Sequence, residues 1–147
     1  MLYNMFMIKE ILNHDDLTTF YFLYDFEIEP NWVEVNNPVY SIGEYDDDKL
    51  NGALTLSYRM GHYILDYIAV RVCKFKKGLG TKLINEMLSW AKKNNIEEIY
   101  LVAKAPKFFE KTGAIYIEDS IGYLDECKKC EFYKTYCNPV SMKYEVK

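Results

Sequence analysis

The sequence predicts an α/β fold, in which strands and helices alternate along the chain around one central sheet. The clearest observation is the segment from Tyr63 to Ala103, where an apolar strand, a basic loop, an amphipathic helix and a second apolar strand follow one another. Such a β–α–β unit is right-handed when its strands are parallel. Half of the 147 residues are hydrophobic, as in globular domains, and no repeat or Pro/Gly linker divides them. A single domain over residues 1–147 is therefore expected.

The first half of the chain predicts one helix and three strands. Asn13 or Asp15 can cap the helix, which is expected to run to about Phe26. The expected strands are Met7–Leu12, Val39–Tyr45 and Leu50–Met60. In the last of these strands apolar and polar residues alternate, which predicts that only one of its faces is buried.

The second half predicts a central strand, two helices and three further strands. Tyr63–Val72 is almost continuously apolar, as expected of a central strand. The helix from Gly78 to about Lys93 carries an apolar stripe and is ended by Asn94 and Asn95. A short helix, Pro106–Thr112, is ended by Gly113. The remaining strands are expected at Glu98–Ala103, Ala114–Glu118 and Ser141–Val146.

The stretch Val70–Leu83, VRVCKFKKGLGTKL, indicates a site for a phosphate group. The first N–H groups of a helix lack intrahelical partners, and the helix dipole adds positive charge there. Gly78 and Gly80 let the backbone approach an anion closely. Positive charge is supplied by Lys74, Lys76, Lys77 and Lys82. The stretch fits neither the Walker pattern, which needs more residues between its glycines, nor the dinucleotide fingerprint, which needs a glycine at Leu83.

Two motifs about thirty residues apart carry a resemblance to a known family. Ile68–Val70 ends the apolar strand, and Gly78–Gly80 follows eight to ten residues after Val70. Downstream, Phe108–Ala114 reads FFEKTGA. In this order and spacing the chain resembles the GNAT superfamily of N-acetyltransferases. The resemblance covers residues 39–118 well, and it implies a mixed, splayed sheet of six to seven strands flanked by about four helices.

The resemblance further implies that the chain binds acetyl-CoA as a co-substrate. In the family the pyrophosphate lies on the loop and helix start, and the pantetheine arm pairs with the end of the preceding strand, much as a peptide adds to a sheet edge. The sheet must splay there to leave those backbone groups unpaired. The cofactor-binding residues implied are Ile68, Ala69, Val70, Arg71, Lys76, Lys77, Gly78, Leu79, Gly80, Thr81, Lys82 and Phe109.

Two positions depart from the family pattern. Phe75 stands where an Arg or Gln shapes the pyrophosphate loop, and the neighbouring lysines can replace the charge but not the bidentate geometry. Phe109 stands where many members carry a tyrosine that can protonate the leaving thiolate. Either the acid lies elsewhere, or water serves, or the catalytic role is diminished. The nearby alternatives in the sequence are Tyr67, Tyr100 and Tyr116.

Asp66 is the leading candidate for the base that accepts the proton of an acceptor amine. It is the only charged residue in the apolar run Tyr63–Val70, and its side chain is expected to share a face with Ile68 and Val70. Desolvation there makes a carboxylate a better proton acceptor. The alternative is that Asp66 hydrogen-bonds a tyrosine or a turn and does no chemistry. His62 is a second candidate base, and a backbone N–H near Val70 could stabilise the oxyanion.

Three cysteines lie in an irregular insertion at about 119–141. Cys127, Cys130 and Cys137 form a C-x2-C-x6-C pattern. A CxxC pair is half of many zinc sites, and a third thiolate six residues later is compatible with one, although a fourth ligand is missing locally. Reduced thiols without a metal and a redox-active CxxC are the two alternatives.

The net charge and the hydropathy of the chain indicate which classes of binding partner are not expected. The net charge of −4 argues against nucleic-acid binding. No apolar run approaches the ~20 residues needed to span a bilayer, so no membrane association is expected. The N-terminus lacks the pattern of a signal peptide, and a cytoplasmic location is expected.

Together these observations predict an N-acetyltransferase that moves the acetyl group of acetyl-CoA directly to a primary amine of a small molecule or protein. One alternative is a non-catalytic, CoA-binding regulatory or sensor module, linked to metal or redox chemistry through the cysteines. Another is a scaffold or interaction domain, and a homodimer is among the oligomeric states left open. The acceptor is not predicted, although Glu34 and Glu44 could face its cleft.

Overall fold

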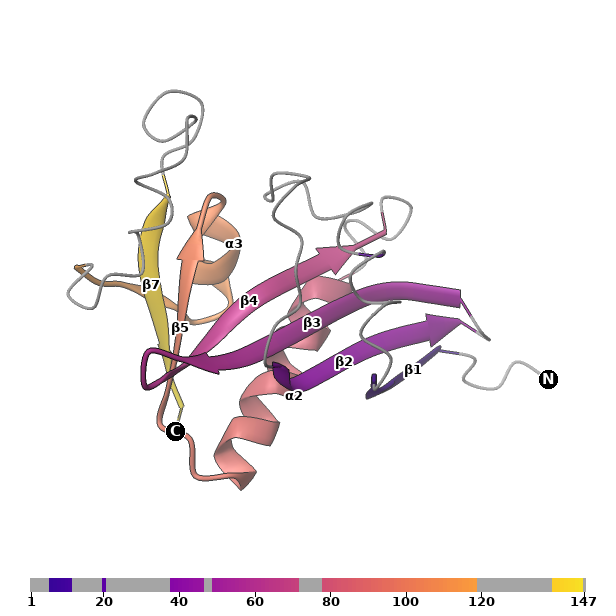
Figure 1. Cartoon of the computed structure of the whole chain (residues 1–147). Helices are drawn as coiled ribbons and strands as arrows, with labels where there is room; N and C mark the ends of the chain where they lie inside the picture. The colour runs from indigo at the N-terminus through magenta and orange to yellow at the C-terminus, as the bar shows by residue number, and fades with distance from the viewer. Residues whose placement is uncertain are drawn as a thin grey trace.

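The computed structural model of the chain describes residues 6–11, 20, 38–46, 49–71, 78–118 and 139–146. Within these residues, seven strands form one mixed sheet in the order β1-β2-β3-β4-β5-β7-β6, and two helices pack against it (Figure 1). The strands are β1 (Phe6–Glu10), β2 (Pro38–Asp46), β3 (Lys49–Arg59), β4 (His62–Val70), β5 (Glu98–Ala103), β6 (Ile115–Tyr116) and β7 (Val140–Glu145). The helices are α2 (Leu79–Lys93) and α3 (Pro106–Lys111).

This architecture confirms the α/β class and the mixed sheet that the sequence predicts. Each expected strand is present, although β6 covers only two residues of the five expected at 114–118. The two helices of the described residues are fewer than the four expected. The helix expected at 13–26 lies outside the described residues except for Phe20.

The sheet consists of an antiparallel N-terminal half and a second half that β5 joins to it. β1, β2, β3 and β4 pair antiparallel in chain order, β5 runs parallel to β4, and β7 lies antiparallel between β5 and β6. β3 and β4 are connected by the two-residue turn Met60–Gly61, whose φ angles are 56° and 78°. Positive φ at both turn residues is the type I′ geometry, which matches the twist of a β-hairpin.

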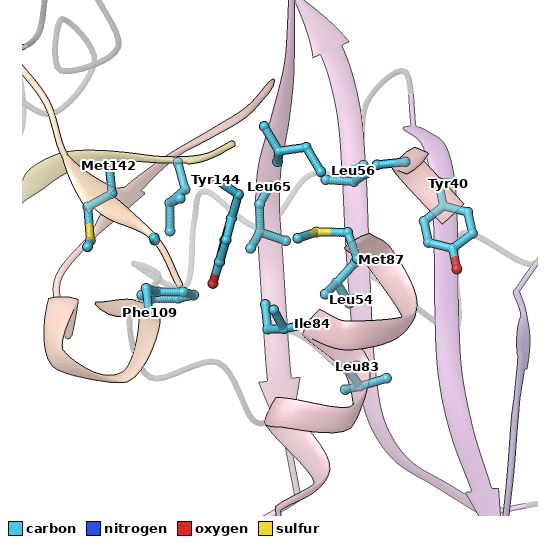
Figure 2. Packing of buried hydrophobic residues seen from close by; sticks show 14 of the residues in the cluster. Tyr40, Leu54, Leu56, Leu65, Leu83, Ile84, Met87, Phe109, Met142 and Tyr144 are labelled. Carbon is cyan, nitrogen blue, oxygen red and sulfur yellow. The ribbon is translucent and has the colours of Figure 1, made fainter. Parts of the chain in front are cut away.

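Helix α2 covers one face of β2, β3 and β4. Its apolar stripe is buried, as the sequence periodicity predicts, and consists of Leu79, Leu83, Ile84, Met87 and Ala91. In Figure 2, Ile84 and Met87 lie against Leu54 and Leu65 of the sheet, all within one buried cluster. The helix ends at Asn94, as expected, and Asn95 follows with a φ of 58°.

Strand β3 is buried on both faces, which makes the expectation of one exposed face wrong. Leu54 and Leu56 are 0% exposed on the face toward α2, and Thr55 and Ser57 are at most 1% exposed on the other face. That second face carries its own apolar cluster, which includes Phe20. The polar alternation therefore reflects small hydroxyl residues inside the protein, and hydrogen bonds such as that between Ser41 Oγ and Thr55 Oγ1, at 3.0 Å, make their burial tolerable.

Helix α3 packs on the second half of the sheet through Phe109, which is 4% exposed. Figure 2 shows its ring beside Met142 and Tyr144 of β7. The Tyr144 hydroxyl lies 2.7 Å from Thr112 Oγ1, and Thr112 Oγ1 in turn donates to the Phe109 carbonyl at 2.9 Å. Burial raises the pKa of the Tyr144 phenol to about 12, so this hydroxyl is neutral at physiological pH.

Candidate functional site

The two halves of the sheet separate between β4 and β5. Their backbones pair only at Ile64 and Tyr100, near the start of both strands. Beyond this pair β4 continues to Val70 and β5 to Ala103 without a further ladder contact between them. In Figure 1 the two strands meet near the β3–β4 turn and diverge from there. The splay expected next to the phosphate loop is therefore present.

The end of β4 offers one free edge toward this opening. Ile68, Ala69 and Val70 pair with β3 on one side, and no described strand pairs with them on the other. The Arg71 N–H donates to the Asn51 carbonyl at 2.7 Å, so β4 is held against β3 to its end. A strand edge of this kind can accept an amide-containing arm as if it were another strand.

Helix α2 begins beside the end of β4. Gly78 precedes it with a φ of 74°, in the left-handed region that favours glycine. No described side chain caps this end, and the first turn contains no acidic residue, so its N–H groups and positive dipole remain available to an anion. Lys82 is exposed in the same turn. Lys76 and Lys77, predicted to hold the pyrophosphate, lie outside the described residues.

Gly80 lies where α2 and α3 approach each other. A Cβ at this position would come within 3.0 Å of Phe108 Cζ and 4.0 Å of Val70 Cγ2. The helix start, the end of β4 and α3 thus converge around Gly80 and Leu79, two of the predicted cofactor residues. The Arg71 side chain instead points to β3, where its Nη2 donates to the Leu50 carbonyl at 2.6 Å.

A family model for the acetyltransferase (GNAT) family matches residues 5–114. The chain belongs to this family. A search of the curated proteins found no match.

Solved structures of GNAT and other acetyltransferases share the fold. An IAA acetyltransferase from Bacillus cereus has a TM-score of 0.71 at 16% identity, covering 96% of this chain and 99% of that chain. The ribosomal-protein-S18-alanine N-acetyltransferase from Escherichia coli has a TM-score of 0.70 at 13% identity, over 97% and 94%. A GNAT family acetyltransferase from Elizabethkingia anophelis, solved with acetyl-CoA bound, has a TM-score of 0.68 at 12% identity, over 98% and 100%. Membership of the GNAT family supports acetyl-CoA-dependent acetyl transfer in general.

Phe109 of this GNAT protein is a core residue. Its ring is 4% exposed and packs edge-on against Phe108, with 5.1 Å between ring centroids. Its backbone carbonyl accepts the Thr112 hydroxyl, and Thr112 holds Tyr144. Sequence reasoning missed the Thr112–Tyr144 pair, because 32 residues separate its members and only the fold brings them together.

Asp66 is the extra residue of a β-bulge. Thr55 pairs with Tyr67, whereas the next residue of β3, Leu56, pairs with Leu65. The Asp66 carboxylate accepts from Arg59, with Nη2 2.7 Å from Oδ1 and Nε 3.4 Å from Oδ2. Its role as a proton acceptor stays a prediction.

The bulge also corrects the expected orientation of Asp66. Leu65 and Ile68 both pack in the cluster under α2, which an unbroken alternation forbids, and Tyr67 packs in the second cluster. Arg59 belongs by alternation to that second face of β3. Asp66 therefore lies on the face opposite Ile68, because a bulge places two successive residues on one face.

A polar group lies at the closed end of the splay, on the face opposite α2. The His62 and Tyr100 rings meet edge to face at a centroid distance of 4.9 Å. Tyr100 hydrogen-bonds Glu98, and burial together with this carboxylate raises the pKa of the phenol. Glu98 forms an ion pair with Lys143 of β7. Sequence reasoning considered Tyr100 but missed Glu98 and Lys143, whose pairing depends on the β5–β7 register.

The other tyrosines suggested as acids lie elsewhere. Tyr116 is 51% exposed on β6, and Tyr67 packs beside the second apolar cluster. Glu44 is 6% exposed and shares the α2 face of β2 with Ile42. The suggestion that it faces the acceptor cleft stays a prediction. Glu34 lies outside the described residues.

Cys127, Cys130 and Cys137 also lie outside the described residues. Among the residues that the structure does describe, no three His, Cys, Asp or Glu side chains gather as metal ligands. Over the same residues, neither helix is long and apolar enough to cross a membrane.

Proposed function

We propose that this protein is an N-acetyltransferase that moves the acetyl group of acetyl-CoA directly to a primary amine of a small molecule or a protein. The observation that carries the proposal is the opening between β4 and β5 beside the start of α2, which no described side chain caps. The opening suits an amide-bearing arm, and the helix start suits a pyrophosphate. The two features are adjacent at Gly80.

The roles of the residues follow from this arrangement. Backbone N–H groups at Gly78 to Thr81, with the charges of Lys76, Lys77 and Lys82, bind and orient the pyrophosphate. The free edge of Ile68–Val70 aligns the pantetheine arm, and an N–H near Val70 stabilises the negative charge on the thioester oxygen during attack. The amine loses one proton, and the thiolate gains one as the C–S bond breaks.

An alternative is a CoA-binding sensor without turnover. The motive for it is the residue type at Phe109, because a phenyl ring stands where many family members carry a tyrosine and has no proton to give to a thiolate. Titration calorimetry with acetyl-CoA, followed by thiol release in a panel of amines, separates the two functions. Binding with turnover supports the transferase, binding without turnover supports the sensor, and absence of binding contradicts both.

The lysines of the loop provide a matched test of the cofactor site. Replacing Lys76 and Lys77 by alanine is expected to weaken acetyl-CoA binding at least about tenfold, because charge-assisted bonds to phosphate contribute ~1.5–3 kcal/mol. The control replaces Lys92 and Lys93, two exposed lysines in the last turn of α2, and leaves the affinity unchanged. Equal losses in both double variants would contradict a pyrophosphate site at the helix start.

A further inference from the structure

The β4 bulge lies where the sheet opens. Asp66, its extra residue, follows two residues after Ile64, the last residue of β4 to pair with β5. A bulge bends its strand and increases the local twist. β4 therefore turns away from β5 at the residue where its regular pairing with β3 is interrupted.

Arg59, on the other strand of the β3–β4 hairpin, binds the Asp66 side chain of this bulge. Arg59 pairs with His62 directly before the two-residue turn, so its backbone is fixed at the closed end of β3 and β4. From there two guanidinium nitrogens reach the two carboxylate oxygens of Asp66, at 2.7 and 3.4 Å. The Asp66 side chain is 17% exposed and that of Arg59 is 40% exposed. The planar fork of arginine thus fixes both the position and the orientation of the carboxylate.

The same contacts oppose a base role for Asp66. Both of its oxygens accept N–H groups from Arg59, so the carboxylate is directed at this guanidinium. A proton acceptor also has to face the attacking amine, whereas this carboxylate faces Arg59.

We propose that the Arg59–Asp66 pair is a positioning device, which holds the bulge that parts β4 from β5 and so places Ile68–Val70 for the pantetheine arm. This inference rests on the proposed function. Asp66 acts through the backbone that follows it and exchanges no proton with the substrate.

Calorimetry with two ligands tests the proposal without knowledge of the acceptor. Acetyl-CoA carries the arm, and adenosine 3′,5′-bisphosphate carries only the nucleotide part. The variants are Arg59→Ala, Asp66→Ala, both together, and Asp66→Asn, which keeps one oxygen for Arg59. Lys143→Ala removes an ion pair between β5 and β7 and serves as the control. Thermal melting verifies that each variant is folded.

The expected result is that Arg59→Ala and Asp66→Ala each weaken acetyl-CoA binding about tenfold, and that the double variant loses no more, since the two residues act as one unit. Binding of the bisphosphate changes less than about twofold, and the control and Asp66→Asn retain most acetyl-CoA affinity. Arg59→Ala with wild-type affinity would overturn the proposal. Absence of acetyl-CoA binding by the wild type would instead contradict the proposed function.

A kinetic readout separates positioning from proton transfer once an acceptor is found. A positioning role predicts that Asp66→Asn keeps the acidic limb of the pH–rate profile and that Arg59→Ala is as impaired as Asp66→Ala. A base role predicts the reverse: Asp66→Asn is as inactive as Asp66→Ala, and Arg59→Ala, which frees the carboxylate, stays active.

Discussion

Thr112 is the residue through which α3 is tied to β7. Its hydroxyl lies 2.7 Å from Tyr144, which is 1% exposed, and it donates to the Phe109 carbonyl. The two partners of this bond are not equivalent. If Tyr144 is replaced by phenylalanine, the Thr112 hydroxyl still donates a hydrogen bond to the Phe109 carbonyl. If Thr112 is replaced, no other described group is bonded to the Tyr144 hydroxyl.

Thr112→Val is therefore expected to cost more stability than Tyr144→Phe. The valine leaves a buried phenol unsatisfied, at a cost of about 1–3 kcal/mol, and the phenylalanine loses one net hydrogen bond, about 0.5–1.5 kcal/mol. Urea unfolding of both variants measures the difference. A larger loss in Tyr144→Phe would contradict the bond pattern described for this pair.

Met60 has a positive φ angle, a backbone conformation that asparagine adopts more readily than methionine. Its φ is 56° in the type I′ turn, and its side chain is 50% exposed, so little packing depends on it. Met60→Asn creates the Asn-Gly pair that this turn prefers, and we expect a gain of about 0.5–1 kcal/mol in the free energy of unfolding. The midpoint of urea unfolding reports the gain, and an unchanged midpoint would show that the turn tolerates methionine without strain.

More of helix α2 than of strand β4 could be predicted from the sequence. The bounds, the buried stripe and the glycine start of α2 follow from a period of 3.6 and from residue types that end helices. The β4 segment was predictable as a strand, but the bulge at Asp66 was not, because no single residue type marks it. The orientation of Asp66 was misjudged for this reason, and the partner Arg59 was missed.

The ion pair between β5 and β7 gives a pH-dependent prediction. The hydrogen bond from Lys143 lowers the pKa of Glu98 from its usual 4.5, and the same bond raises the pKa of Lys143 from 10.5. The Glu98 contribution is therefore present above pH 4.5 and lost as the pH falls below it, and the Lys143 contribution is lost only above pH 10.5. The difference in melting temperature between wild type and Lys143→Ala should stay constant at neutral pH and shrink below pH 4.5. A constant difference down to about pH 3 would mean that the pair contributes nothing through charge.

At the scale of the whole molecule, strands from both ends of the chain join one sheet, since β1 and β7 belong to it. The fold class, the succession of strands along the chain and the bounds of α2 could be read from local patterns. The burial of Thr55 and Ser57 could not, because it depends on what covers the second face. The predicted single domain over residues 1–147, the acetyl acceptor and the metal or redox role of the cysteines stay predictions.

Unfolding at high pH is expected to accompany the deprotonation of two buried tyrosines. Burial raises the pKa of Tyr40 and of Tyr144 from 10.0 to about 12. Each therefore stabilises the fold up to pH 10, and that stability is lost as the pH rises toward 12. Tyrosinate absorbance, followed together with circular dichroism, should show a late step that coincides with loss of structure. Titration of every tyrosine near pH 10 in an intact fold would contradict the burial of these two rings.

The start of α2 also has a consequence for the lifetime of the protein. No described side chain satisfies the N–H groups of its first turn, so the bound cofactor would take over the role of a helix cap. A ligand that binds only the folded chain adds about 2.7 kcal/mol of stability at a hundred times its Kd. Under the proposed function, a fall in the supply of CoA is therefore expected to raise the fraction of unfolded chain that is exposed to proteases.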